Sequence, residues 1–160
     1  MAKDQTSIAA DTGSNGGVDD GGLRQFTGYH LKRAYNVLRS DLSRTLEPLG
    51  LRITTYSTLI LIVENPGIRQ SELAAVLDIE RPNMVVILDA LEQRGWINRE
   101  RVEADRRAYA LVATLSGRRV CARAVELDQE HEAKMLANLQ EREINDLVAA
   151  LNKIERIWEN

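Results

Sequence analysis

Hydrophobic residues recur at three- and four-residue intervals from Leu23 onward, a spacing that places side chains on one face of an α-helix. Pro48 and Gly50 predict the end of this helix. The stripe comprises Leu23, Phe26, Leu31, Ala34, Tyr35, Leu38, Leu42 and Leu46. Residues 1–22 are rich in Gly, Ser, Asp and Asn and have little to bury, so we predict a disordered tail there.

Three shorter helical patterns occupy residues 54–94. The first, 54–63, is followed by the breaker pair Pro66-Gly67. The second lies in RQSELAAVL, residues 69–77, and the third begins near Pro82, which suits the first turn of a helix, and ends before Gly95. Because residues 78–80 leave only a short connection between the last two, the pattern predicts a helix-turn-helix.

A β-hairpin is predicted directly after this pair. WINRERV (96–102) alternates apolar and polar residues, EADR (103–106) reads as a turn, and RAYALVAT (107–114) favours a strand. Two more helices are predicted, over about 117–139 and 141–158. We therefore expect a mostly α (α+β) fold: a winged helix-turn-helix with a two-stranded wing, flanked by N- and C-terminal helices.

The composition fits a helical protein but does not identify what the protein binds. Aromatic residues make up 4% of the chain, and 21 basic against 24 acidic residues give a net charge of -3. Since this balance provides no general attraction to nucleic acid, a DNA-binding function must depend on where the charges lie. The single cysteine, Cys121, excludes an intramolecular disulfide, and no apolar run approaches the ~20 residues of a membrane span. We expect a cytoplasmic protein without a membrane partner.

Residues 66–117 resemble the MarR family of bacterial transcription regulators. The resemblance rests on Gln70, Glu72-Leu73-Ala74, Leu88-Asp89-x-Leu91-Glu92, Gly95, Asp105-x-Arg107 and Thr114-x-x-Gly117, and it extends over about 23–158. It implies a homodimer on a palindromic double-stranded DNA operator. Residues 23–50 and 117–160 would then form the dimerisation helices, and 51–116 the DNA-binding domain. Arg69 stands where a Ser or Thr helix cap is common in the family.

The helix that begins near Pro82 is the candidate recognition helix. Its apolar face is occupied by core residues, so the first turns present Arg81, Pro82, Asn83, Val85 and Val86 to the outside. Arginine can donate two hydrogen bonds to guanine, asparagine can pair with adenine, and valines can contact thymine methyl groups. The two valines are equally compatible with covering another part of the protein.

The hairpin tip and the first helix of the pair supply further DNA-contact candidates. Asp105 is spaced to hold Arg107, with Arg106 free at the turn, an arrangement suited to a narrow minor groove. The alternative is a solvated ion pair worth about 0–1 kcal/mol. Candidates for phosphate contacts, which are alternatively ordinary surface residues, are Arg69, Gln70, Ser71 and Arg99.

The family resemblance also implies a small effector, often an aromatic or phenolic acid or its CoA thioester, bound between the dimerisation helices and the winged helix. Phe26, Tyr29, His30 and Arg33 combine aromatic surface with a cation on neighbouring turns, which suits such a ligand. Packing in the dimer with solvated polar tips is an equally good interpretation of these residues.

We find no pattern for catalysis, a cofactor or a metal. HEAKM (131–135) has the His-Glu pair of a zinc-protease helix, but Met135 occupies the position of the second histidine. Cys121 reads as a small buried hydrophobe. Redox-sensing members of the resembled family carry their cysteine near the first helix, where this chain has none. The resemblance therefore implies a ligand-responsive repressor, and we expect no enzyme. The alternative is a winged-helix module that binds proteins.

Overall fold

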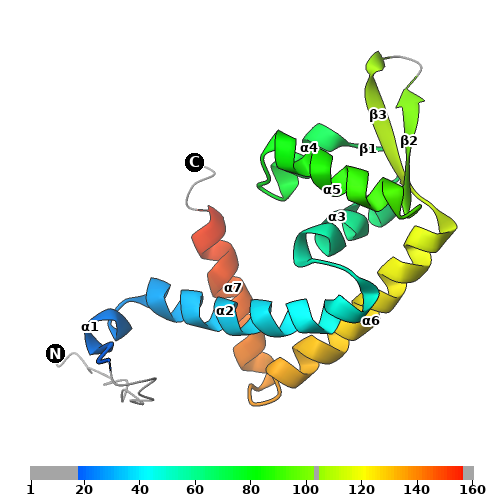
Figure 1. The fold of residues 1–160 in the computed structure, drawn as a ribbon. Helices are drawn as coiled ribbons and strands as arrows, with labels where there is room; N and C mark the ends of the chain where they lie inside the picture. Colours follow the sequence, from blue (N-terminus) through cyan, green and yellow to red (C-terminus); the bar gives the residue numbers. More distant parts are fainter. Residues whose placement is uncertain (1–17, 103–104, 157–160) are drawn as a thin grey trace. The chain divides into compact units, whose positions relative to one another are not determined.

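The computed structural model describes residues 18–102 and 105–156, without the side chains of residues 102 to 108. The chain divides into two compact units, Met1–Arg39 and Ser40–Asn160. The fold is mostly helical with one small antiparallel sheet, which confirms the predicted class (Figure 1).

The N-terminal helix is interrupted where the sequence predicted continuity. Helix α1 (Gly21–Arg24) is followed by Gln25 and Phe26 before α2 (Thr27–Leu46) begins. Asp20 organises α1: its carbonyl accepts the Leu23 N–H at 2.8 Å, and its carboxylate accepts Arg24 Nε at 2.6 Å. Thus α1 starts inside the predicted tail, 1–22, of which residues 1–17 lie outside the described residues.

The second unit contains the predicted helix-turn-helix (Figure 1). After α2, a 3-10 turn (Glu47–Leu49) ends at Gly50, whose φ of 66° confirms the predicted break. Helices α3 (Ile53–Glu64), α4 (Gln70–Val76) and α5 (Arg81–Gln93) follow, and Gly95 with φ 68° ends α5 as expected. The predicted boundaries hold within a few residues.

The core of this unit joins α3, α4, α5 and the sheet. Leu59, Leu73, Leu88, Ile97 and Leu111, one or more from each of these elements, are at most 1% exposed and belong to one cluster. Burying a leucine or isoleucine side chain contributes about 1.5–3 kcal/mol relative to leaving it in water. The shared cluster therefore holds the helix pair and the base of the hairpin in fixed positions.

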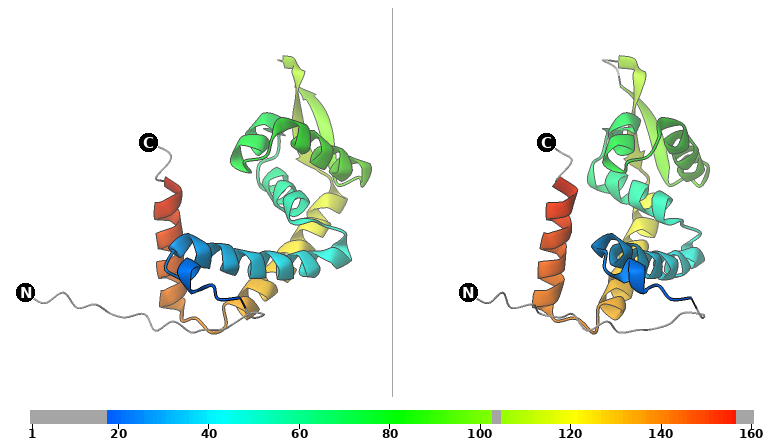
Figure 2. Two further views of the ribbon diagram at one scale, coloured as in Figure 1. Left: turned by 60° about the vertical axis from the view of Figure 1, so that its left-hand side comes forward. Right: turned by 90° about the vertical axis from the view of Figure 1, so that its left-hand side faces the viewer.

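The sheet has three strands where the sequence predicted two. Strands β2 (Ile97–Val102) and β3 (Asp105–Ala113) form the antiparallel wing, and the short β1 (Ile68–Arg69) pairs with the other edge of β3. Because β3 already begins at Asp105, the turn is shorter than the predicted 103–106. Both views in Figure 2 show the hairpin extending away from α4 and α5.

Two helices close the chain. Helix α6 (Leu115–Met135) begins two residues before the predicted Gly117, because the Thr114 hydroxyl accepts the Gly117 N–H at 3.0 Å and caps it. It ends at Met135, before the predicted Leu139. Helix α7 (Glu141–Glu155) was predicted to continue to Trp158, which lies outside the described residues. Four of its apolar residues are 39–50% exposed: Leu147, Val148, Leu151 and Ile154.

In the described ranges, no single helix is long and apolar enough to cross a membrane. The two bent segments Thr27–Leu49 and Ile53–Glu64 reach the length and apolar composition of a membrane span only when they are taken together. A buried core helix meets the same criterion, and α3 contributes Leu59 and Ile62 to the core.

Candidate nucleic-acid interface

The turn between α4 and α5 fixes the direction in which α5 leaves the helix pair. The Ile79 N–H donates to the Ala74 carbonyl at 2.9 Å, and Asp78 adopts a left-handed conformation with φ 49°. Pro82 lies in the first turn of α5, where its missing N–H costs no helical hydrogen bond. The chain therefore reverses within a few residues and presents the start of α5 at the surface.

The two faces of α5 are clearly separated. Met84 and Leu88 are fully buried and Leu91 is 1% exposed, so one face is committed to the core. The predicted recognition residues all lie on the exposed side, with Val85 at 40% and Val86 at 67% exposure: Arg81, Pro82, Asn83, Val85 and Val86. The two valines are thus not covered by another described part of the chain.

The start of α4 contains three of the predicted phosphate-contact residues, but the Glu72 carboxylate already lies there. Arg69 and Ser71 are exposed and Gln70 is half-buried. Glu72 accepts the Arg69 N–H at 2.7 Å, which supplies the cap that the sequence lacks at Arg69. A phosphate at this helix end would therefore lie beside the Glu72 carboxylate, and the Arg69 side chain would have to provide the attraction.

Arg99, the other predicted phosphate contact, forms ion pairs within the protein. Its guanidinium donates to Glu92 at 2.9 Å and to Asp89, both on α5, and the side chain is only 24% exposed. Arg99 therefore braces the wing against the recognition helix. Arg101, two residues further along β2, is exposed, and the alternation of a strand places it on the same face. The sequence analysis did not single it out.

The wing tip holds the remaining predicted contacts. Asp105, Arg106 and Arg107 form the first residues of β3, and Val102 pairs with Asp105 across the hairpin. Their side chains, and therefore the predicted pairing of Asp105 with Arg107, lie outside the described residues. Tyr109, the next described side chain along β3, is 44% exposed and faces Arg101 in the register.

Within the first unit, two of the four predicted effector residues bind an internal carboxylate. Asp20 accepts the Tyr29 hydroxyl at 2.7 Å and Arg33 Nη1 at 3.3 Å. Hydrogen bonds from Arg24 and then Tyr29 lower the pKa of Asp20 from 3.8 to about 2. Tyr29 and Arg33 thus already donate to a carboxylate of the chain itself.

The other two predicted effector residues do not contact that carboxylate. The His30 ring nitrogen Nε2 lies 2.7 Å from the Arg24 carbonyl, and Phe26 is 58% exposed. The four predicted residues are close in the chain, but only Tyr29 and Arg33 donate hydrogen bonds to the same group, the Asp20 carboxylate.

The HEAKM histidine is buried on α6 and lies near two carboxylates. His131 Nε2 lies 3.4 Å from Asp41, and Nδ1 lies 3.7 Å from Asp128, which accepts the Tyr56 hydroxyl at 2.8 Å. Across the residues with described positions, no group of three metal-ligating side chains could hold a metal ion. Cys121 is buried, as predicted, and burial raises the pKa of its thiol.

These features define a winged helix-turn-helix protein whose candidate recognition helix, α5, is exposed along one face. A model of the MarR family matches residues 51–109. The transcriptional repressor Rv2887 of Mycobacterium tuberculosis is 31% identical over 127 residues, which cover 78% of this chain and 91% of the relative. The chain therefore belongs to the MarR family of transcriptional regulators.

Solved structures of the repressor CouR agree with this assignment. CouR bound to a 23-mer DNA duplex has a TM-score of 0.83 and 38% identity, covering 87% of this chain and 99% of that one. CouR bound to p-coumaroyl-CoA has a TM-score of 0.80 and 35% identity, with coverage of 88% and 99%.

Proposed function

We propose that two copies of this chain form a repressor that binds a palindromic operator through the first turns of α5. The observation that carries the proposal is the exposed set Arg81, Asn83, Val85 and Val86 on a helix whose other face is buried in the core. Such a helix can enter the major groove without losing core contacts. The similarity to CouR, solved on a DNA duplex, supports the same use of α5 here.

Dimerisation through residues 23–50 and 117–160 is part of the proposal. The exposed apolar residues of α7 support it, since Leu147, Leu151 and Ile154 recur at helical spacing and are 39–46% exposed. A second copy would remove them from water. Sedimentation at micromolar concentration should give the mass of two chains; a monomer under these conditions would refute this part.

We propose an aromatic acid or its CoA thioester as the effector, held by Tyr29 and Arg33 with Phe26 and His30 nearby. That Tyr29 and Arg33 bind the Asp20 carboxylate supports an acid as the ligand, and the acid would have to displace Asp20 from them. CouR in complex with p-coumaroyl-CoA and Rv2887 in complex with salicylic acid support the class of ligand. An effector must bind the DNA-free form more tightly than the operator-bound form to cause release.

The operator can be obtained by sequencing genomic fragments that the purified protein retains. On that duplex, Asn83→Ala should relax preference at one base position, with a loss of about 1–3 kcal/mol for the preferred base. Arg107→Ala should weaken binding to all duplexes and reduce the salt slope by about one. Arg44→Ala, an exposed arginine in the last turn of α2, is the control. Because α2 belongs to the proposed dimerisation helices, the variant is first shown by sedimentation to remain a dimer, and it should then leave both properties unchanged.

The outcomes separate the two functions considered for this fold. A uniform loss of affinity for Asn83→Ala across sequences would place Asn83 on phosphate. Wild-type protein that shows no preference for any retained fragment over random duplex would refute the operator proposal. That result would favour the protein-interaction module instead.

A further inference from the structure

A strap of residues 20–24 in the first unit contacts most of the predicted effector residues. The strap consists of Asp20 and helix α1, and none of the residues of α1 is buried. It lies within hydrogen-bonding distance of three of the four predicted residues: Tyr29, His30 and Arg33. Because no buried side chain of α1 anchors the strap, it can separate from α2 without a loss of core packing.

The two carboxylate oxygens of Asp20 have different partners. Oδ1 accepts a hydrogen bond from Arg24 Nε at 2.6 Å, inside the strap. Oδ2 accepts the Tyr29 hydroxyl at 2.7 Å and Arg33 Nη1 at 3.3 Å, both on α2. An incoming acid therefore has to replace only Oδ2, since the ion pair with Arg24 can move away with the strap and keep the Asp20 carboxylate partnered. The 2.7 Å contact between His30 Nε2 and the Arg24 carbonyl would open at the same time.

Tyr29 and Arg33 also support each other without the strap. They lie one turn apart on α2, and Arg33 Nη1 donates to the Tyr29 hydroxyl at 3.3 Å. The guanidinium lies 5.6 Å from the centre of the Tyr29 ring, which adds a cation–π contact. The Arg33 side chain is 43% exposed, so an anion from solvent can reach it. Removal of Asp20 would therefore leave a preformed pair of donors.

We propose that Asp20 is an internal competitor of the effector: its carboxylate holds Tyr29 and Arg33 until an acid takes the place of Oδ2. This inference rests on the proposed effector site at Tyr29 and Arg33. Only the fraction of molecules in which the strap has opened can bind an acid, so the measured dissociation constant exceeds the intrinsic constant by the inverse of that fraction. The strap therefore sets the effector concentration to which the protein responds.

Asp20 competes over the whole pH range in which an ordinary carboxylic acid is charged. Hydrogen bonds from Arg24 and then Tyr29 lower the pKa of Asp20 to about 2. At a pH where Asp20 begins to lose its charge, an acid with an ordinary pKa of about 4 is already neutral. Acidification therefore weakens the ligand before it weakens the strap.

Benzoate is the probe, titrated into the isotope-labelled full chain without DNA and followed by the NMR signals of Tyr29 and Arg33. Asp20→Ala should lower the dissociation constant about tenfold, because one competing charged hydrogen bond is lost. Asp19→Ala is the matched control: it removes the same charge, but the hydrogen bond of Asp19 is with the Gly21 N–H at 2.9 Å. It should bind benzoate as wild type does. Benzamide, which has the ring without the charge, should bind wild type and Asp20→Ala equally weakly.

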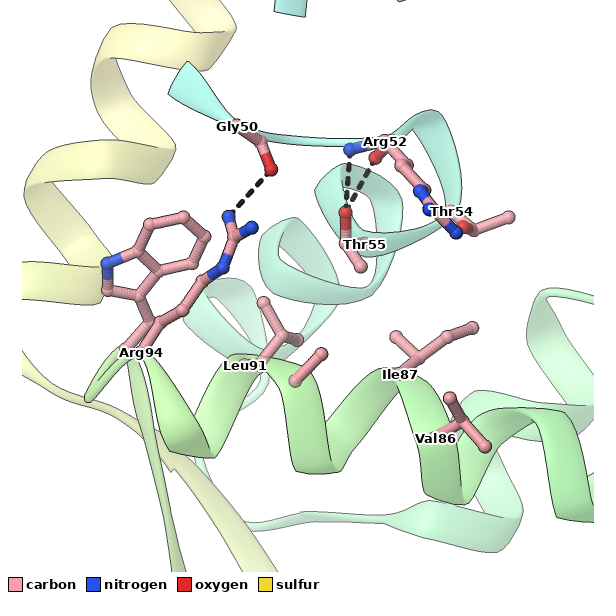
Figure 3. A pocket seen from close by; sticks show the side chains of 10 residues that line it. Gly50, Arg52, Thr54, Thr55, Val86, Ile87, Leu91 and Arg94 are labelled. Atoms are coloured by element: carbon pink, nitrogen blue, oxygen red, sulfur yellow. Dashed lines mark hydrogen bonds between the residues drawn. The ribbon is translucent and has the colours of Figure 1, made fainter. Parts of the chain in front are cut away.

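Signals from the second unit separate this site from a pocket there. That pocket has a volume of about 280 Å³, and its lining includes Gly50, Val86 and Trp96 (Figure 3). Arg94, which also lines it, donates to the Gly50 carbonyl at 2.6 Å. The Trp96 indole therefore reports benzoate in the pocket, whereas Tyr29 reports benzoate at the strap.

The outcomes distinguish the strap from the effector site itself. Arg33→Ala should abolish the saturable Tyr29 shifts, both alone and combined with Asp20→Ala. Saturable Tyr29 shifts with an equal or higher dissociation constant in Asp20→Ala would overturn the strap alone. Shifts confined to Trp96, or no saturable shift in either protein at tens of millimolar benzoate, would overturn the strap together with the proposed effector site. Because DNA is absent, loss of the operator function would leave these results intact.

Discussion

Gly117→Ala tests the contact that joins the winged helix to α6. A Cβ at Gly117 would lie 2.0 Å from the Trp96 carbonyl oxygen, and it would meet two further backbone atoms of Trp96 at 2.8 and 3.1 Å. Real Cβ contacts essentially never fall below 3.0 Å, so the backbone must separate by about 1 Å. The carbonyl that would be displaced accepts the Thr114 N–H at 2.9 Å.

The expected cost follows from opposing effects. Forcing backbone apart in a packed region costs about 1–3 kcal/mol, and disturbing the Thr114 cap adds about 1 kcal/mol. Alanine gains about 1 kcal/mol over glycine in a helix. We expect the free energy of unfolding to fall by about 1–3 kcal/mol, which corresponds to a melting temperature lower by roughly 2–12 °C for a chain of this length.

Urea unfolding followed by circular dichroism, at one fixed protein concentration, measures this change. Gly28→Ala is the matched control, since no atom lies within 4 Å of its added Cβ and Gly28 lies in α2. It should leave stability unchanged or raise it by up to about 1 kcal/mol. Equal stability of Gly117→Ala and wild type would contradict the close approach of Trp96 to α6.

Three further measurements address individual contacts. Arg99→Ala should lower the free energy of unfolding by about 1 kcal/mol. In a double-mutant cycle with Asp89→Ala, the two losses of stability should be coupled, and losses that simply add would argue against the ion pair. The Asp20 carboxyl should titrate near pH 2 by NMR, and a midpoint near 3.8 would contradict its hydrogen bonds to Arg24 and Tyr29. Because its pKa is lowered in the folded chain, the carboxylate stabilises the fold fully above pH 3.8, and this contribution is lost as the pH falls through 2. Cys121, 4% exposed and with a raised thiol pKa, should react with a disulfide reagent far more slowly in folded than in urea-unfolded chain, and a fast reaction before unfolding would contradict its burial.

The orientation of α5 could be predicted from the sequence because helical periodicity determines which residues share a face. Once Met84 and Leu88 are assigned to the core, Asn83 and Val86 must lie outside. The end of α5 at Gly95 could also be predicted from local sequence, since few residues other than glycine accept a φ of 68°.

Contacts between distant segments could not be predicted in this way. Strand β1 has two residues, too few to show alternation, and its pairing depends on where β3 lies. The engagement of Arg99 had a signal in the sequence, because Asp89 and Glu92 are three residues apart on the helix that precedes the strand. The pocket that Gly50, Val86 and Trp96 line had no such signal, since it is assembled from separate parts of the chain.

Site-directed DNA cleavage tests most directly whether α5 enters the major groove. With Cys121 replaced by Ala, a Val85→Cys variant can carry an iron chelate on α5, and Glu130→Cys can carry it on α6 as a control. On a retained genomic fragment, position 85 should cleave the duplex in two clusters about one helical turn, or ~10 bp, apart, and position 130 should not. Background cleavage from position 85 on a fragment that the variant still binds would contradict the use of α5 as the recognition helix.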